Sequence, residues 1–188
     1  HSTSSAASDV YKRQIIYLVF IMKPKIIDNF LSHHELGHLQ EAMLDDDFPW
    51  YWGPMVVPDE DSNCDPLDNW QMYHPFYQPP VIKDTPYFNV LSPILEKLGV
   101  RSILRIKGNL KPRSIERIQH GYHVDFPWND SLTAIFYVNS NNGLTIFEDG
   151  TEVQSVENRI IVFPVNLKHA GTTCTDAKRR VLINFNYF

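Results

Sequence analysis

The segment LTAIFYVNSNNGLTIFEDGTEVQSVENRIIVF, residues 132–163, alternates short apolar runs with tight-turn sequences. The turns are Asn141-Asn142-Gly143 and Asp149-Gly150, and further apolar runs follow the same pattern at 103–110 and 179–188. Short strands joined by tight turns, with no helices between them, are typical of antiparallel sandwiches and barrels. We therefore predict a mainly β fold of the α+β class, with the sheet in the second half of the chain.

Helices are predicted before this sheet. Ser32 and Glu35 have the spacing of a capping box, and apolar side chains follow at helical spacing at Leu36, Leu39 and Met43. A second helix is predicted between Asp84 and Leu98; it begins at Thr85-Pro86 or at Ser92-Pro93, and Gly99 ends it.

The aromatic segment 45–80 contains scattered prolines and is predicted to be ordered but irregular. Its rings, in FPWYWG (48–53) and WQMYHPFY (70–77), either form a wall of a substrate pocket or close the edge of the core. We favour the core for most of them.

Composition sets the broad class. A chain of 188 residues with 43% hydrophobic residues suits one globular domain. Its net charge of −5 argues against a nucleic-acid backbone as partner. Cys64 and Cys174 have no metal-site or paired spacing, which indicates a reducing compartment and two small core residues. We expect a cytoplasmic protein.

The N-terminus differs from the rest. Residues 1–21 are predicted to be a disordered tail or a vector-derived remnant, and a single domain is expected over 22–188, with Met22 as the natural start. The apolar run 15–22 is too short to span a membrane.

Candidate metal ligands lie in HGYHVDFPWND, residues 120–130. His123 and Asp125 are two residues apart, so in an extended chain their side chains leave the same face. A third nitrogen would complete the set of two histidines and one carboxylate that binds non-haem Fe(II) and leaves positions open. His169, after the strand at 159–163, is the candidate.

The final strand offers a polar pocket wall. Arg180, Leu182, Asn184 and Asn186 share one face of it, whereas Arg179, Val181, Ile183 and Phe185 share the other. Two asparagines are unusual on a core strand, and they are expected if that face lines a polar pocket.

His123-x-Asp125, His169 and a basic residue about ten positions further on resemble the iron(II)- and 2-oxoglutarate-dependent oxygenase superfamily, most closely its prolyl-hydroxylase-like branch and small phage and bacterial members. The resemblance implies a double-stranded β-helix (jelly roll, cupin-like). It also implies that Arg180 pairs with the distal carboxylate of 2-oxoglutarate and that Tyr137 helps bind this cosubstrate. Asn184, which shares the strand face of Arg180, is expected to contact the cosubstrate as well. Arg179 stays an alternative to Arg180, because the spacing from His169 is slightly long.

The resemblance further implies the cofactors Fe(II), 2-oxoglutarate and O2, with succinate and CO2 as products. We expect a hydroxylase acting on a small-molecule or peptide substrate, first of all a peptidyl or amino-acid side chain, with neither nucleic acid nor membrane as partner.

Other residues are open candidates for the pocket. Arg105 and Lys107 share a strand face with Asn109 and point into the pocket or into solvent. Trp128 lines the substrate entrance or packs. His120 precedes the motif, but the position of Asp125 favours His123 as the ligand.

Two other functional classes stay open. A cupin-type metal enzyme would use the same fold without 2-oxoglutarate; it would not need Arg180 and would add histidines near the first pair. A non-catalytic jelly-roll binding module would need no metal at all. Fe(II)-dependent conversion of 2-oxoglutarate to succinate discriminates among the three.

Overall fold

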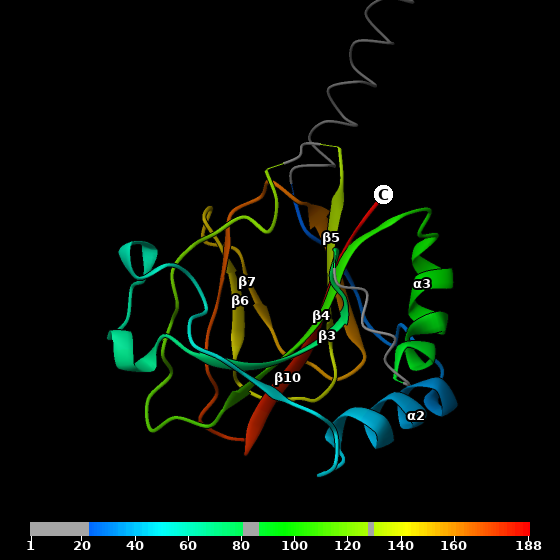
Figure 1. The fold of residues 1–188 in the computed structure, drawn as a ribbon, viewed down its shortest axis with the longest axis horizontal. Helices are drawn as coiled ribbons and strands as arrows, with labels where there is room; N and C mark the ends of the chain where they lie inside the picture. Colours follow the sequence, from blue (N-terminus) through cyan, green and yellow to red (C-terminus); the bar gives the residue numbers. More distant parts are fainter. Residues whose placement is uncertain (1–22, 81–86, 128–129) are drawn as a thin grey trace, which may run out of the picture.

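Two antiparallel sheets pack face to face in the computed structural model, which describes residues 23–80, 87–127 and 130–188 (Figure 1). The larger sheet contains, in spatial order, β1 (Lys25–Ile27), β8 (Arg159–Pro164), β5 (Leu132–Tyr137), β10 (Arg179–Tyr187), β4 (Ile103–Pro112), β3 (Gln71–Tyr77) and β2 (Tyr51–Gly53). The smaller contains β7 (Glu152–Gln154), β6 (Leu144–Phe147) and β9 (His169–Gly171). The predicted mainly β jelly roll is confirmed.

Helices cover the outer face of the larger sheet (Figure 1). In α2 (His33–Leu44), the Ser32 side chain accepts from the Glu35 amide, and the Glu35 carboxylate accepts from the Ser32 amide. This is the predicted capping box, which satisfies two backbone donors that the first turn leaves without partners. The buried stripe of Leu36, Leu39 and Met43 packs against the sheet, as its spacing predicts.

The second helix, α3 (Ser92–Leu98), follows the 3₁₀ turn η3 (Phe88–Leu91). Pro93 lies in its first turn, where a missing N–H costs nothing. Gly99 ends the helix at φ 66°, a left-handed conformation that glycine adopts without strain. The structure therefore decides for Ser92-Pro93 as the start of the helix; the predicted stretch 84–86 lies outside the described residues.

Strand β10 divides the interior in two. Val181, Ile183 and Phe185 pack toward the helices, in a cluster with the side chains of α2 and α3. The opposite face belongs to the space between the sheets, where Leu182 packs with residues of both sheets. The predicted alternation of β10 is confirmed, and its polar face looks into the sandwich.

The prediction that segment 45–80 is irregular is wrong in part. It contains β2, β3 and the 3₁₀ turns η1 (Asp59–Asp61) and η2 (Pro66–Asp68). β3 tolerates Pro75 because β2 pairs only with residues 71–73, so one side of the strand is an edge at the proline. The rings of Phe48, Trp50 and Phe76 belong to or pack against the core, as favoured.

Three smaller predictions can be placed. Residues 1–21 lie outside the described residues. Cys174 is buried, as expected, but Cys64 is only half-buried because it lies in the loop beside η2. Among the described residues, no helix has the length and apolar character needed to cross a membrane.

Candidate metal centre and cosubstrate pocket

A backbone bridge brings the two candidate histidines together. The His123 amide donates to the His169 carbonyl at 3.0 Å, and the His169 amide donates back to the His123 carbonyl at 3.0 Å. Residues that exchange both bonds lie directly opposite each other, so their side chains share a face. The ring centroids are 4.7 Å apart. His169 is fixed from its other side by pairing with Phe147 of β6.

Asp125 joins the pair from the His123 side. One ligand atom from each of His123, Asp125 and His169 lies within 4.8 Å of the other two. Each ring uses its Nδ1–H on the carbonyl two residues earlier, His123 on Gly121 at 3.3 Å and His169 on Leu167 at 3.1 Å. In the neutral form of each ring, Nε2 then carries no proton, which is the state that a metal requires.

The Asp125 carboxylate is held by three neighbours. Oδ1 accepts from Nη2 of Arg105 at 2.9 Å, and Oδ2 accepts from Nδ2 of Asn186 at 2.9 Å and from the Thr133 hydroxyl at 3.3 Å. Asn186 also accepts from Nε of Arg105 at 3.1 Å, which closes a triangle. Arg105 and Asn186 therefore orient the carboxylate of Asp125, the candidate metal ligand.

Electrostatics prepare the three groups for a cation. Burial and the nearby His169 together lower the pKa of His123 to about 4, so His123 is neutral at neutral pH. Burial alone would raise the pKa of Asp125, but its electrostatic interactions with His169, Arg105 and His123 and the hydrogen bond from Asn186 hold it well below its usual range. Two imidazole rings and an ionised carboxylate are donors that fit Fe(II).

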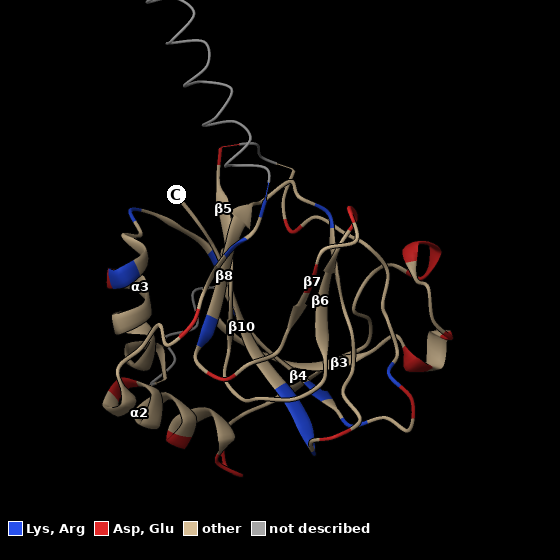
Figure 2. Ribbon diagram, turned by 180° about the vertical axis from the view of Figure 1, so that it is seen from behind, with Lys and Arg blue, Asp and Glu red and all other residues tan. Residues whose placement is uncertain are grey.

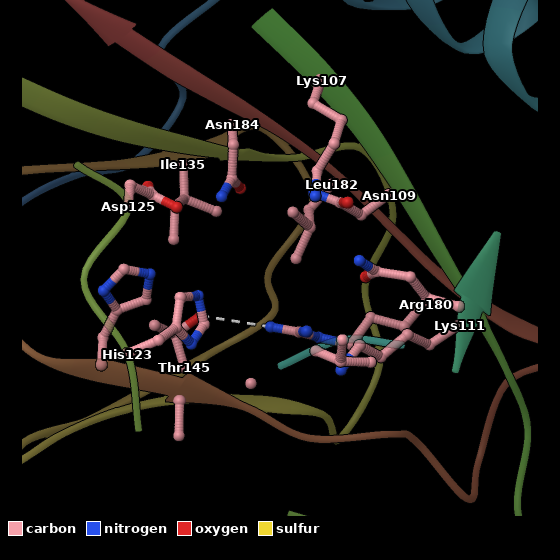
Figure 3. A pocket seen from close by; sticks show the side chains of 15 residues that line it. Lys107, Asn109, Lys111, His123, Asp125, Ile135, Thr145, Arg180, Leu182 and Asn184 are labelled. Carbon is pink, nitrogen blue, oxygen red and sulfur yellow. Dashed lines mark hydrogen bonds between the residues drawn. The ribbon is translucent and has the colours of Figure 1, made fainter. Parts of the chain in front are cut away.

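A cavity of about 490 Å³, which includes space open to solvent, runs from these ligands between the sheets. Figure 3 shows His123 and Asp125 at one end and Arg180 at the other, with Ile135, Thr145 and Leu182 among the residues between them.

Arg180 is a buried cation of this cavity. It is 1% exposed, and its Nε, Nη1 and Nη2 donate to the Ser155 hydroxyl (2.8 Å), the Thr172 carbonyl (3.3 Å) and the Thr145 hydroxyl (3.2 Å). Gly143 lets the arginine pass, because a Cβ there would lie 2.5 Å from Cδ of Arg180. Arg179 points to the other side, where its guanidinium donates to the Leu44 carbonyl at the end of α2. The geometry favours Arg180 over Arg179.

Solved structures share this architecture at low sequence identity. A prolyl hydroxylase from Trichoplax adhaerens, in complex with a hypoxia inducible factor oxygen degradation domain peptide, is 11% identical with a TM-score of 0.65, over 100% of this chain and 94% of that one. A Pseudomonas putida prolyl-4-hydroxylase is 13% identical (TM-score 0.55; 87% and 91%). The alpha-ketoglutarate-dependent carbocyclase SnoK from nogalamycin biosynthesis is 14% identical (TM-score 0.63; 99% and 84%).

The chain has the fold of the iron(II)- and 2-oxoglutarate-dependent oxygenases. No protein-family model and no curated protein matches its sequence. The structural likeness therefore shows the oxygenase fold.

Within the oxygenase fold, Tyr137 lies behind the cavity. It is fully buried, its hydroxyl donates to the Thr145 hydroxyl at 2.8 Å, and its ring centroid is 5.8 Å from Cζ of Arg180. It is not among the described side chains that line the cavity. Tyr137 thus acts on the pocket through Thr145, whose oxygen accepts from both Tyr137 and Arg180 and whose own proton stays free to donate.

One face of β4 lines the pocket beside β10, its neighbour in the larger sheet. Lys107, Asn109 and Lys111 line the cavity, and Arg105 lies at the metal end. Asn184 also lines it, and the Oδ1 atoms of Asn109 and Asn184 are buried without a hydrogen-bond partner. Lys111 was missed by the sequence analysis. The period-two pattern 105, 107, 109 reaches it at the next step, but the strand was predicted to end at Leu110.

The remaining candidates separate clearly. His120 is buried and its Nδ1 lies 2.7 Å from Nζ of Lys111, so it belongs to the cationic end and is no additional ligand of the kind a cupin would use. Trp128 lies outside the described residues. Asn186 touches Asp125 and not the open cavity.

Proposed function

We propose that this chain is an Fe(II)- and 2-oxoglutarate-dependent dioxygenase that hydroxylates a C–H bond of a peptidyl or amino-acid substrate. The convergence of His123, Asp125 and His169 within 4.8 Å is the observation that carries the proposal. Fe(II) would be held by Nε2 of the two histidines and by the Asp125 carboxylate, and 2-oxoglutarate would extend from there toward Arg180. When bound, this pair supplies O2 activation: 2-oxoglutarate, O2 and R–H give succinate, CO2 and R–OH.

The protein's own residues prepare the site in three ways. The Arg105–Asn186 pair keeps Asp125 ionised and aimed at the metal position. The carbonyls of Gly121 and Leu167 fix the tautomers of the histidines. Ile135 and Leu182 line the stretch between the two ends with apolar surface, which limits water around the reacting groups.

The substrate class is inferred from the resemblance and from the structures that share the fold. One structure of this fold holds a peptide and another is named as a carbocyclase, so the fold serves both peptides and small molecules. The prolyl-hydroxylase resemblance makes a peptidyl side chain the first candidate, and a screen of peptides and amino acids for products that gain one oxygen atom tests it.

The reaction type is tested by Fe(II)-dependent formation of succinate from 2-oxoglutarate, which proceeds slowly even without the substrate. We expect succinate only when Fe(II) and O2 are both present. Metal binding without succinate formation would indicate a cupin-type enzyme, and a lack of metal binding would indicate a binding module.

A further inference from the structure

The end of the cavity remote from the metal ligands carries two cations. Lys111 of β4 and Arg180 of β10 are direct cross-strand partners, and both line the cavity. Both are buried, with 5% and 1% of their surface exposed. The chain as a whole is acidic, with a net charge of −5, and its acidic residues gather elsewhere, for example on the 3₁₀ turns of segment 59–68 (Figure 2). The cationic pocket end is therefore a local feature.

Gly171 of β9 leaves room between the two cations. A Cβ at this position would lie 3.4 Å from Nη1 of Arg180 and 3.7 Å from Nζ of Lys111. Both nitrogens thus face the same small space, which the missing side chain keeps open. In Figure 3, Lys111 and Arg180 lie together at the end of the pocket opposite His123 and Asp125.

Both cations have donors to spare. Arginine carries five N–H donors, and Arg180 makes three hydrogen bonds, which leaves one N–H on each of its terminal nitrogens. Nζ of Lys111, which carries three N–H donors, lies 2.7 Å from Nδ1 of His120, and the His120 ring also contacts the carbonyls of Gly171 (Nδ1, 3.1 Å) and Asp68 (Nε2, 3.3 Å). Among the described residues, no carboxylate forms an ion pair with either cation, and the cavity's own carboxylate, Asp125, is paired with Arg105.

Two like charges side by side in a buried space repel each other more strongly than in water, and burial and the neighbouring Arg180 accordingly hold the pKa of Lys111 well below its usual range. A carboxylate between them offsets this repulsion and accepts from both, because its two oxygens offer about four lone-pair sites. The Thr145 hydroxyl adds one more donor on the same side of the cavity.

We propose that Lys111 is a second cosubstrate-binding cation, which shares the distal carboxylate of 2-oxoglutarate with Arg180 in the space over Gly171. This inference rests on the proposed function and deepens it. It assigns to Lys111 a role in specificity: the pair selects a 2-oxo acid that ends in a second carboxylate over one that ends in a methyl group.

The experiment measures binding by calorimetry, without turnover, on the full chain loaded with Mn(II) in the absence of O2. The two probes are 2-oxoglutarate and 2-oxopentanoate, which has the same metal-binding head and a methyl group in place of the distal carboxylate. In the wild type we expect 2-oxoglutarate to bind at least about 100-fold more tightly.

Lys111→Met keeps the length of the side chain and removes its charge. We expect it to lower the affinity for 2-oxoglutarate about 10- to 100-fold and to change the affinity for 2-oxopentanoate less than about 2-fold. The reason is that a charge-assisted hydrogen bond is lost only with the first probe. Lys168→Met, at an exposed lysine paired with Glu148, is the matched control and should change neither. An unchanged affinity for 2-oxoglutarate, or an equal loss for both probes, would overturn the role of Lys111.

Gly171→Ala is a second test that does not depend on how the protein tolerates a change at Lys111. The added methyl group meets its neighbours at ordinary contact distance, so the fold should persist, but it occupies the space between the cations. We expect Mn(II) binding to be retained and the preference for 2-oxoglutarate over 2-oxopentanoate to fall at least about 10-fold; an unchanged preference would contradict the inference. A wild type that binds Mn(II) but not 2-oxoglutarate would instead refute the proposed function itself.

Discussion

The two ends of the cavity differ in how their charged side chains are balanced. At the metal end, the one carboxylate, Asp125, is already neutralised by Arg105 and tied to Asn186. At the other end, the hydrogen bonds of Arg180 and Lys111 within the described part of the chain go to uncharged oxygens and a histidine nitrogen. The charge of the Asp125 carboxylate is thus balanced within the protein, whereas we propose that a bound anion balances the charge at the cationic end.

The two ends therefore contribute differently to the stability of the fold and to the affinity for ligands. A compensated ion pair, linked by hydrogen bonds, orients a ligand before the metal binds. An uncompensated buried charge costs stability and returns that cost when its counter-charge binds. Mutations at the two ends should therefore affect metal binding, cosubstrate binding and stability in different proportions.

The largest effect is expected at the metal end. His123→Ala removes one of the three ligands, and we expect metal affinity to fall more than about 100-fold, beyond what is typical of residues that only orient ligands. Titration with Mn(II) measures it. His38→Ala, at an exposed histidine on α2, is the control and should bind metal as the wild type does. Retention of wild-type affinity by His123→Ala would remove the metal centre from this end of the cavity.

A substitution at the cationic end should leave metal affinity nearly unchanged. Arg180→Met removes the charge and three hydrogen bonds, and we expect 2-oxoglutarate affinity to fall about 100-fold while Mn(II) affinity stays within about 2-fold. The free energy of unfolding of the unliganded protein should change by less than about 2 kcal/mol, because the lost bonds are offset by the removal of a buried charge. Calorimetry and urea denaturation measure the two quantities.

The stability measurement is the sharper part of that test. A loss well beyond 2 kcal/mol would mean that Arg180 is a structural cation whose charge the unliganded fold already compensates. The contrast between the two ends would then be wrong, even if 2-oxoglutarate binding also fell.

Much of the fold could be predicted because its signals are local. The capping box at Ser32 and Glu35, Gly99 after α3 and the period-two runs of β4, β5, β6 and β10 each act within a few residues. β3 was missed because the tolerance for Pro75 depends on β2 ending short of it, which is a fact about the neighbouring strand. β9 was missed because three residues carry no periodicity.

The candidate site also combines features that the sequence predicts with features that it does not. Local patterns predict the same-face arrangement of His123 and Asp125, two residues apart, and the alternation of β10. The bridge between His123 and His169, the pairing of Arg105 with Asp125 and the space over Gly171 arise from chain segments at least 20 residues apart. No local pattern encodes these contacts.

The smallest effect is expected at Arg179, the neighbour that the sequence left as an alternative. Its guanidinium donates to the Leu44 carbonyl at the end of α2, on the helix side of the sheet and away from the cavity. Arg179→Ala should leave Mn(II) and 2-oxoglutarate affinities within about 2-fold of the wild type and cost about 1 kcal/mol of stability, the typical value of one hydrogen bond. Because residues 179 and 180 are adjacent on β10, the pair of variants compares the same charge on opposite faces of one strand. If Arg179→Ala weakened 2-oxoglutarate as strongly as Arg180→Met, the effect would come from damage to β10, and the face of the strand would no longer explain which arginine meets the cosubstrate.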